Sequence, residues 1–236
     1  MAYQFDFSAV FEYSTALLHG AGTTLALTAI GTIVGGAIGV IGGGCRAWRV
    51  RPFNYVFAVY VEAIRNTPFL VQLLFIFFGL PSLGIQINEW QASVFTIVIN
   101  LGAYITEIVR AGIQETPRGQ IDAASALAMS RFAIFRHVIL RPALQKVWPA
   151  LTSQIVIVML GSSVVSQIAT EDLTFVANFI QSRNFRALET YIVVTLMYCV
   201  LALLLRQLLM WIGRRWVVAR PAKAVVTQFS VEGGNA

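Results

Sequence analysis

Long apolar segments alternate with short polar ones along this chain. Five apolar segments are candidates for helices that cross a membrane, and they cover residues 20–44, 54–80, 90–110, 147–168 and 191–212. A helix needs about 20 predominantly apolar residues to cross the hydrocarbon core of a bilayer. The pattern therefore predicts an all-α integral membrane protein with about five transmembrane helices.

The composition agrees with this reading. Of the 236 residues, 57% are hydrophobic and only 12% are charged, far below the charged fraction of a soluble domain. The first 13 residues contain no Lys or Arg, so we expect no cleaved secretory signal. We expect an extracytoplasmic segment at 1–19, a membrane domain at 20–215 and a flexible cytoplasmic tail at 216–236. Cys45 and Cys199 show neither metal-ligand spacing nor a disulfide framework.

The basic residues predict the orientation. The loop at 45–51, the stretch 107–147 and the part of the chain from Arg206 onward hold 14 of the 17 Lys and Arg residues. Lys and Arg near the ends of spans favour the cytoplasmic side. We therefore expect the N-terminus outside and the C-terminus inside. This topology explains the net charge of +6 better than binding to nucleic acid does.

Two features inside the spans indicate how the helices pack. Gly31, Gly35, Gly39 and Gly43 are spaced by four, so they form one ridge on which another helix can pack closely. The second span contains Glu62, Arg65 and the run Asn66-Thr67-Pro68. The two charges are three apart and can pair on one helix face near the interface. Alternatively, the proline breaks the helix and the break lines a translocation path.

The stretch 107–147 is polar, basic and helix-forming. Thr116 and Pro117 are typical of a helix start, with Thr as the cap and Pro at the first helical position, so we expect a helix over 117–128. Ser130 is a second candidate cap, which predicts two short helices joined by a turn at 128–130. Such a loop indicates a partner docked on the cytoplasmic face, or an amphipathic hairpin that lies on the membrane.

This loop resembles the EAA loop of ATP-binding-cassette (ABC) importer permeases. Asp122, Ala123 and Ala124 stand at the E-A-A positions, and Ala128 stands at the glycine that follows them in the family. Three further segments resemble the polar amino-acid permease family within that group: RNTPFLVQL at 65–73, NLGAYITEIVRAGI at 100–113 and PRGQIDAA at 117–124. The similarity runs from about residue 20 to 215.

The chain departs from the family pattern in several places. Asp122 keeps the charge of the usual Glu on a shorter stem, and Arg141-Pro142 moves the family proline by one place. Ala128 replaces a glycine, so a left-handed turn there would be strained. Where relatives carry a charged polar run in span four, this chain reads LGSSV at 160–164, which weakens the transfer of a charged substrate contact.

The resemblance implies a type I ABC importer-like fold and a role as the transmembrane subunit of an ATP-driven importer. The cargo would be a polar or charged amino acid, and the location the bacterial inner membrane. The implied partners are two ATP-binding cassette subunits, a second permease chain, identical or paralogous, and an extracytoplasmic solute-binding protein. Asp122, Ala123, Ala124 and Ala128 would contact the ATPase and couple it to transport.

The chain itself is not expected to be an enzyme. It has no P-loop sequence, so ATP and Mg²⁺ would bind the partner ATPase, and no cofactor, catalytic residue or metal site is expected here. An intramembrane protease would need a base beside a nucleophile within a span, but His19 and His137 lie outside the spans. An ion-gradient-driven transporter or a channel subunit is the alternative, and the absence of an internal repeat counts against it.

A zwitterionic substrate needs hydrogen-bond donors and acceptors at membrane depth. Uncharged polar residues of spans two, three and four are the candidates for the substrate path: Thr67, Gln72, Asn100, Ser162, Ser163 and Gln167. Ser163 and Gln167 are four apart and would share one face of an α-helix. The alternative is that these side chains form hydrogen bonds between helices.

Overall fold

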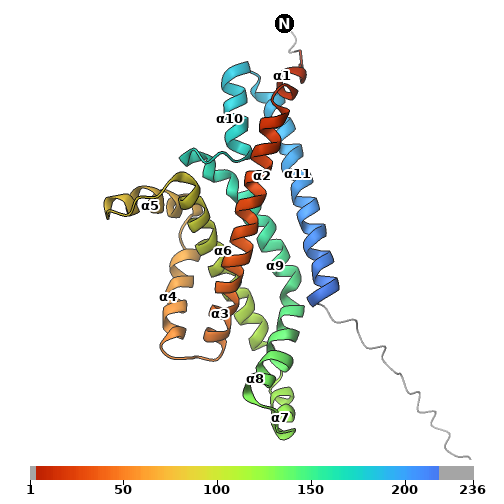
Figure 1. Cartoon of the computed structure of the whole chain (residues 1–236). Coiled ribbons are helices and arrows are strands. Elements are labelled where there is room, and N and C mark those ends of the chain that lie inside the picture. The colour runs from red at the N-terminus through yellow and green to blue at the C-terminus, as the bar shows by residue number, and fades with distance from the viewer. Residues whose placement is uncertain (1–3, 218–236) are drawn as a thin grey trace, which may run out of the picture.

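The computed structural model describes residues 4–217, and every regular element in that range is helical (Figure 1). The longer helices are α2 (Ser14–Ile30), α3 (Gly36–Ala47), α4 (Phe53–Arg65), α5 (Phe69–Ser82), α6 (Glu89–Gln114), α9 (Arg141–Gly161), α10 (Leu173–Asn184) and α11 (Ala187–Ile212). The shorter elements are α1 (Ser8–Phe11), η1 (Gly31–Gly35), α7 (Arg118–Ala126), α8 (Arg131–Ala133), η2 (Ile134–Leu140), η3 (Ser162–Ile168) and η4 (Gly213–Val217). The predicted all-α fold is confirmed.

The expected spans are present, and the helical stretches that contain four of them are longer than expected. Within the described residues, four stretches are long and apolar enough to cross a membrane, at 14–47, 89–114, 131–168 and 187–217, and the bent pair α4–α5 makes a fifth. The first and third stretches have 34 and 38 residues, or about 50–57 Å at 1.5 Å per residue. Because the hydrocarbon core is only about 30 Å thick, their ends project beyond it.

Span four was expected to begin at about residue 147, but the helix that contains it begins earlier. The helix that starts at Arg131 continues through η2 into α9 without a break. Pro142 has no N–H to donate to the preceding turn, which belongs to the π-helical segment η2, yet neither Pro142 nor Pro149 ends the helix. The second helix of the basic loop is thus continuous with the helix of span four.

The glycine ridge packs closely against another helix, as predicted, and that helix is α6. A Cβ atom on Gly35 would lie 2.8 Å from the carbonyl oxygen of Val98, and one on Gly43 would lie 2.8 Å from Val109. Gly31 and Gly39 are closed off in the same way by side chains of α6. Only glycine allows this approach of two helix backbones, so α3 and α6 form one tightly packed pair.

The core of the molecule is built around α6. Its apolar face repeats at intervals of four, through Ile97, Leu101, Ile105, Val109 and Ile113, and all five side chains are buried in one cluster. In the most apolar part of this span 67% of the residues are buried, compared with 11% in the span that contains α11. The outer face of α11 is thus left to lipid or to another chain.

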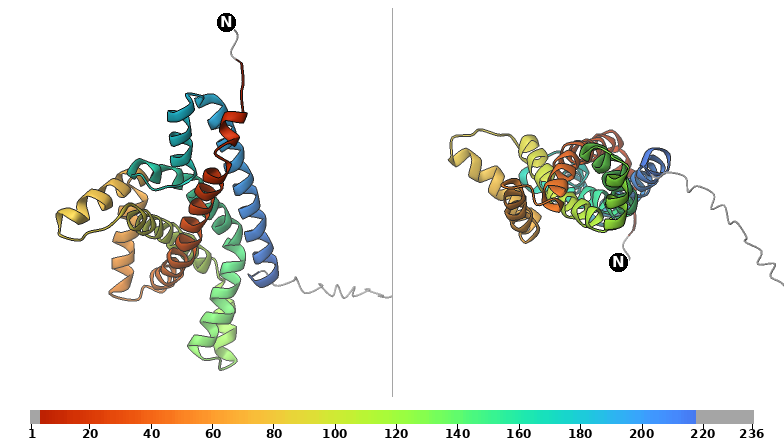
Figure 2. Two further views of the ribbon diagram at one scale, coloured as in Figure 1. Left: turned by 45° about the horizontal axis from the view of Figure 1, so that its top comes forward. Right: turned by 90° about the horizontal axis from the view of Figure 1, so that it is seen from below.

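The two ends of the bundle differ in their loops. In Figure 1 α1 and α10 lie at one end, and α7, α8 and the α3–α4 connection lie at the other. Figure 2 shows α5 projecting sideways from the bundle. The basic loops therefore share one end, as the charge pattern predicted. Most of the tail expected at 216–236, from residue 218 onward, lies outside the described residues, as do residues 1–3.

Candidate functional site: a broken helix, a polar cavity and a basic hairpin

The second span is broken where the sequence offered that possibility. α4 ends at Arg65, α5 begins at Phe69, and the two axes are bent by 107°. Pro68 has an extended backbone (ψ 140°) and has no N–H to continue the helix. The alternative, an ion pair between Glu62 and Arg65, is wrong: none joins them among the described residues. Instead, Glu62 accepts a hydrogen bond from Asn66.

Polar side chains satisfy the backbone at the break. Nε2 of Gln72 donates to the carbonyl oxygen of Ile64 at 2.7 Å and to that of Thr67 at 3.0 Å. Nδ2 of Asn100 donates to Oε1 of Gln72 at 3.0 Å, which ties the break to α6. An unsatisfied carbonyl inside a membrane costs several kcal/mol. Gln72, which is buried, thus holds the bend in place rather than facing a solute.

A cavity of about 260 Å³ lies beside this break. Three elements contribute polar groups to it: Thr67 from the break, Asn100 and Tyr104 from α6, and Gln154 from α9. The guanidinium carbon of Arg65 lies 5.4 Å from the centre of the Tyr104 ring. The cavity thus brings together two of the six residues expected in the substrate path, Thr67 and Asn100.

Sequence reasoning missed Tyr104 and Gln154. The signal was present for Gln154, which is an amide within the apolar run of span four, since polar side chains within a membrane usually face a cavity or another helix. Tyr104 gave no such signal, because tyrosine is common at the ends of spans.

Gln72 and three further path candidates do not line this cavity. Ser162, Ser163 and Gln167 lie on η3, a 3₁₀ segment that follows α9. Ser162 is buried and donates to the carbonyl oxygen of Met159 at 2.7 Å. Because a 3₁₀ helix has three residues per turn, Ser163 and Gln167 do not share a face. That expectation is wrong, and accordingly Ser163 is half-buried while Gln167 is exposed.

The basic loop forms the predicted hairpin, which we call the α7–α8 hairpin (residues 118–133). Ser130 accepts a hydrogen bond from the N–H of Ala133 and so caps the second helix, as predicted. Ala128 has φ 55°, the strained left-handed conformation expected at this position. The first cap was predicted wrongly: Pro117 occupies the N-cap position of α7, and no side chain caps that helix.

The four candidate coupling residues divide into two groups. Asp122, Ala123 and Ala128 are exposed, so another protein can approach them. Ala124 is only 4% exposed and belongs to the main hydrophobic cluster, so it holds α7 to the rest of the hairpin. Sequence reasoning missed Leu127, which is 77% exposed at the tip and gives the hairpin a large apolar contact.

An ion-pair network lies where α6 approaches the hairpin. Glu107 accepts from Arg46 at the end of α3 and from Arg110 one turn further along α6. Arg110 also donates to Oε1 of Gln114, the last residue of α6, at 2.6 Å. The end of α6 that leads into α7 is therefore held in a fixed position against α3.

Comparison with known proteins agrees with this arrangement. The chain matches the family model for the "binding-protein-dependent transport system inner membrane component" over residues 15–218. The glutamine transport system permease protein GlnP of Escherichia coli (strain K12) is 37% identical over 214 residues, or 90% of this chain and 98% of that protein. The arginine transport system permease protein ArtQ of Bacillus subtilis (strain 168) is 32% identical over 201 residues, or 85% of this chain and 92% of that protein.

Solved structures show the same fold. The crystal structure of an amino acid ABC transporter with histidines contains a chain that matches with a TM-score of 0.81 at 36% identity, over 90% of this chain and 100% of that one. The MetNI methionine ABC transporter matches with a TM-score of 0.69 at 24% identity, over 89% of this chain and 99% of that one, which supports the fold alone. The chain therefore belongs to the family of inner-membrane components of binding-protein-dependent transport systems.

Proposed function

We propose that this chain is the transmembrane subunit of an ATP-driven importer for a polar or charged amino acid. A solute-binding protein delivers the amino acid on the extracytoplasmic side. The names of the glutamine and arginine permeases among its relatives support this substrate class. Two ATP-binding cassette subunits bind ATP and Mg²⁺ and hydrolyse the nucleotide, and a second permease chain, identical or paralogous, completes the membrane part.

The observation that carries this proposal is the continuity of α6 between cavity and hairpin. Asn100 and Tyr104 line the cavity, and the same helix ends at Gln114, directly before α7. Asp122, Ala123, Leu127 and Ala128 are exposed on the hairpin and form the contact with the ATPase. A displacement of the hairpin by the ATPase thus reaches the cavity through one rigid element.

The uncharged polar groups of the cavity can bind a zwitterion, without a charged side chain as a partner. The hydroxyl of Thr67 and the amides of Asn100 and Gln154 supply donors and acceptors. Phe69, the first residue of α5, also lines the cavity, so the positive end of the α5 dipole lies beside it and favours a carboxylate. Ser162, Ser163 and Gln167 remain a second proposed contact region along the path, and Gln72 supports the first.

The test is uptake of radiolabelled glutamine and arginine into proteoliposomes that contain the assembled complex. We expect uptake only with the binding protein, and only when ATP is on the side that bears the hairpin. The matched control has ATP replaced by ADP and an imposed proton or sodium gradient. Uptake that follows the gradient and ignores ATP would establish the alternative, an ion-gradient-driven transporter.

A further inference from the structure

The end of α11 is fixed to α9 by one tryptophan. Nε1 of Trp148 donates to the carbonyl oxygen of Leu209 at 3.0 Å. Its ring fills the space beside Gly213, where a Cβ atom has no room. The turn η4 that follows is therefore held against the beginning of α9.

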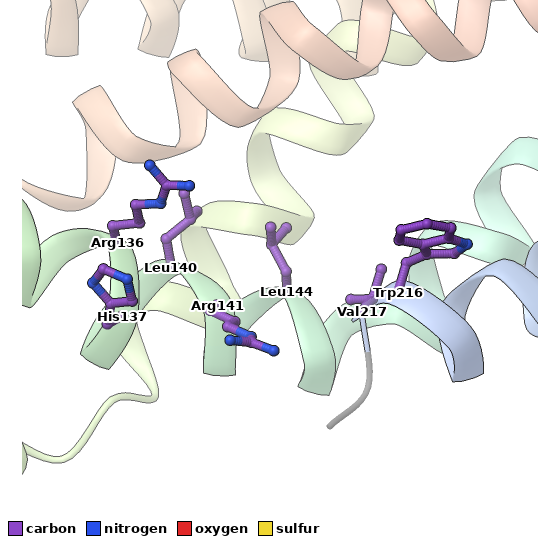
Figure 3. A pocket seen from close by; sticks show the side chains of 7 residues that line it. All are labelled: Arg136, His137, Leu140, Arg141, Leu144, Trp216 and Val217. Atoms are coloured by element: carbon purple, nitrogen blue, oxygen red, sulfur yellow. The ribbon is translucent and has the colours of Figure 1, made fainter. Parts of the chain in front are cut away.

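This docking leaves a pocket of about 370 Å³ between η4 and the helix η2–α9. Figure 3 shows Arg136, His137, Arg141 and two leucines along one helix, with Trp216 and Val217 at the end of the other. Leu140 and Leu144 are half-buried and form an apolar floor. Trp216 is 75% exposed at the rim. The pocket combines an apolar floor, an aromatic rim and two guanidinium groups.

The two arginines of this pocket form no ion pair within the part of the chain that the structure describes. Within residues 4–217, the acidic side chains that form ion pairs with arginine are Asp6, Glu107 and Glu189, and none of them pairs with Arg136 or Arg141. Nδ1 of His137 is 3.1 Å from the carbonyl oxygen of Ala133, and an imidazole ring supplies no negative charge to the arginines. Both arginines are exposed and can turn toward an anion.

The position of the pocket selects among anions. It lies where the apolar run of α11 ends and the basic residues Arg214 and Arg215 begin, which is the depth at which lipid headgroups meet a transmembrane helix. Guanidinium groups bind phosphate in a bidentate manner. Basic pockets between transmembrane helices bind the headgroups of anionic lipids. A free inorganic phosphate would use the arginines but would leave the apolar floor and Trp216 without a partner.

We propose that this pocket binds an anionic phospholipid. Arg136 and Arg141 hold its phosphodiester, while Leu140, Leu144 and Trp216 contact the glycerol and the first part of the acyl chains. The lipid then links the end of α11 to the segment that follows the α7–α8 hairpin. The site depends on the chain being in a membrane, and it does not depend on which amino acid is transported.

The test is native mass spectrometry of the assembled transporter after removal of co-purified lipid. Phosphatidylglycerol and phosphatidylcholine with identical acyl chains are titrated separately, and phosphatidylglycerol also in the presence of millimolar inorganic phosphate. The variant is Arg136→Gln with Arg141→Gln. The matched control is Arg49→Gln with Arg118→Gln, which removes two exposed arginines from the same end of the molecule but outside the pocket.

We expect the wild type and the control to bind phosphatidylglycerol at least tenfold more tightly than phosphatidylcholine. The pocket variant should lose about thirtyfold in phosphatidylglycerol affinity, since each of the two basic side chains near a membrane surface contributes about 1 kcal/mol. Trp216→Ala should lower the affinity for both lipids. Equal losses of phosphatidylglycerol affinity in the pocket variant and the control would overturn the assignment of the site. Displacement of phosphatidylglycerol by inorganic phosphate would overturn the assignment to a lipid.

Discussion

Arg46 at the end of α3 donates from Nη1 to Oε2 of Glu107 on α6, and the two atoms are 2.6 Å apart. Arg110 donates to both oxygens of the same carboxylate. The three side chains are only 15–26% exposed, so water screens their charges weakly. Glu107 therefore joins two helices immediately before the hairpin that we propose contacts the ATPase.

Replacing Glu107 by Gln should lower stability. The amide removes the negative charge and leaves two partly buried guanidinium groups side by side, a change worth about 1–2 kcal/mol where water still has access. For a chain of this size we expect the melting temperature to fall by about 3–6 °C, measured by scanning fluorimetry in detergent. Glu115→Gln, at an exposed position, is the control and should change little. Equal melting temperatures for the two variants would show that the network is unimportant.

Replacing Ala123 by Arg should uncouple ATP hydrolysis from transport. Ala123 is exposed on α7, so a long charged side chain there would obstruct the proposed contact without disturbing the core. We expect at least a tenfold loss of substrate-stimulated ATP hydrolysis in the assembled complex, with normal membrane insertion. Val50→Arg, which adds the same charge in the loop between α3 and α4, is the control. Normal stimulation of ATP hydrolysis in Ala123→Arg would show that the hairpin does not form the coupling contact.

Replacing Thr67 and Gln154 by Ala should weaken substrate binding. Both side chains line the cavity, and the loss of two hydrogen bonds to a charged ligand is worth about 3–6 kcal/mol at most. We expect KM for uptake to rise at least tenfold, with basal ATP hydrolysis unchanged. Ser163→Ala with Gln167→Ala tests the second region in the same assay. If only this second pair raises KM, the substrate contact lies at η3 and the cavity is a packing defect.

Asp172 should make stability depend on pH. It is fully buried and caps α10, where Oδ1 accepts from the N–H of Phe175 at 2.8 Å and Oδ2 accepts from the hydroxyl of Tyr198 at 3.1 Å. Burial raises the pKa of this carboxyl to about 6, from 3.8. The folded chain therefore holds this proton more tightly than the unfolded chain does. The resulting stability is fully present below about pH 4 and is lost as pH rises to about 6.

Asp172→Asn separates this effect from the other titrating groups. Asn caps helices about as well as Asp and carries no charge at any of these pH values. We expect the wild type to lose up to about 3 kcal/mol more than Asp172→Asn between pH 4 and pH 7, which shifts their relative melting temperatures by several degrees. The pKa of Asp6 is lowered, mainly by hydrogen bonds from Ser8, so its effect on stability has the opposite sign but is common to both proteins. Parallel pH profiles would contradict a raised pKa at Asp172.

The orientation of the chain is a separate prediction. α1 and the end of α11 lie toward opposite ends of the molecule (Figure 1), and the basic loops lie toward the end that bears the hairpin. We expect a tag after Ala236 to be reached by a membrane-impermeant reagent only in inverted vesicles, and a tag before Tyr3 only in right-side-out ones. Labelling of both tags from the same side would exclude an odd number of spans.

The sequence was sufficient to predict features that depend on the spacing of residues along one helix. The four glycines predicted a close helix contact, and the proline after Asn66-Thr67 indicated a break as one of two readings, because both effects are local. The strained turn at Ala128 was predictable for the same reason. Span ends were less predictable, since a helix continues through polar residues when tertiary contacts hold it, as at Arg131.

The candidate site was only partly predictable. Thr67 and Asn100 stood out as polar residues in apolar segments, but their meeting with Tyr104 and Gln154 depends on how three separate elements pack. The inward position of Ala124 was hidden, because alanine fits both an exposed and a buried face of a short helix. The 3₁₀ geometry at Ser163 was equally hidden, since hydrogen-bond pattern is not encoded by residue type alone.

The glycine ridge has a mechanical consequence. Gly35 meets the backbone of Val98, and the other three glycines meet β-branched side chains of α6, which have little rotamer freedom with which to absorb a movement. α3 and α6 must therefore move together as one rigid body. A displacement of the end of α6 then tilts both helices and moves Asn100. The ion pair between Arg46 and Glu107 joins the two helices near the point where the hairpin would be displaced.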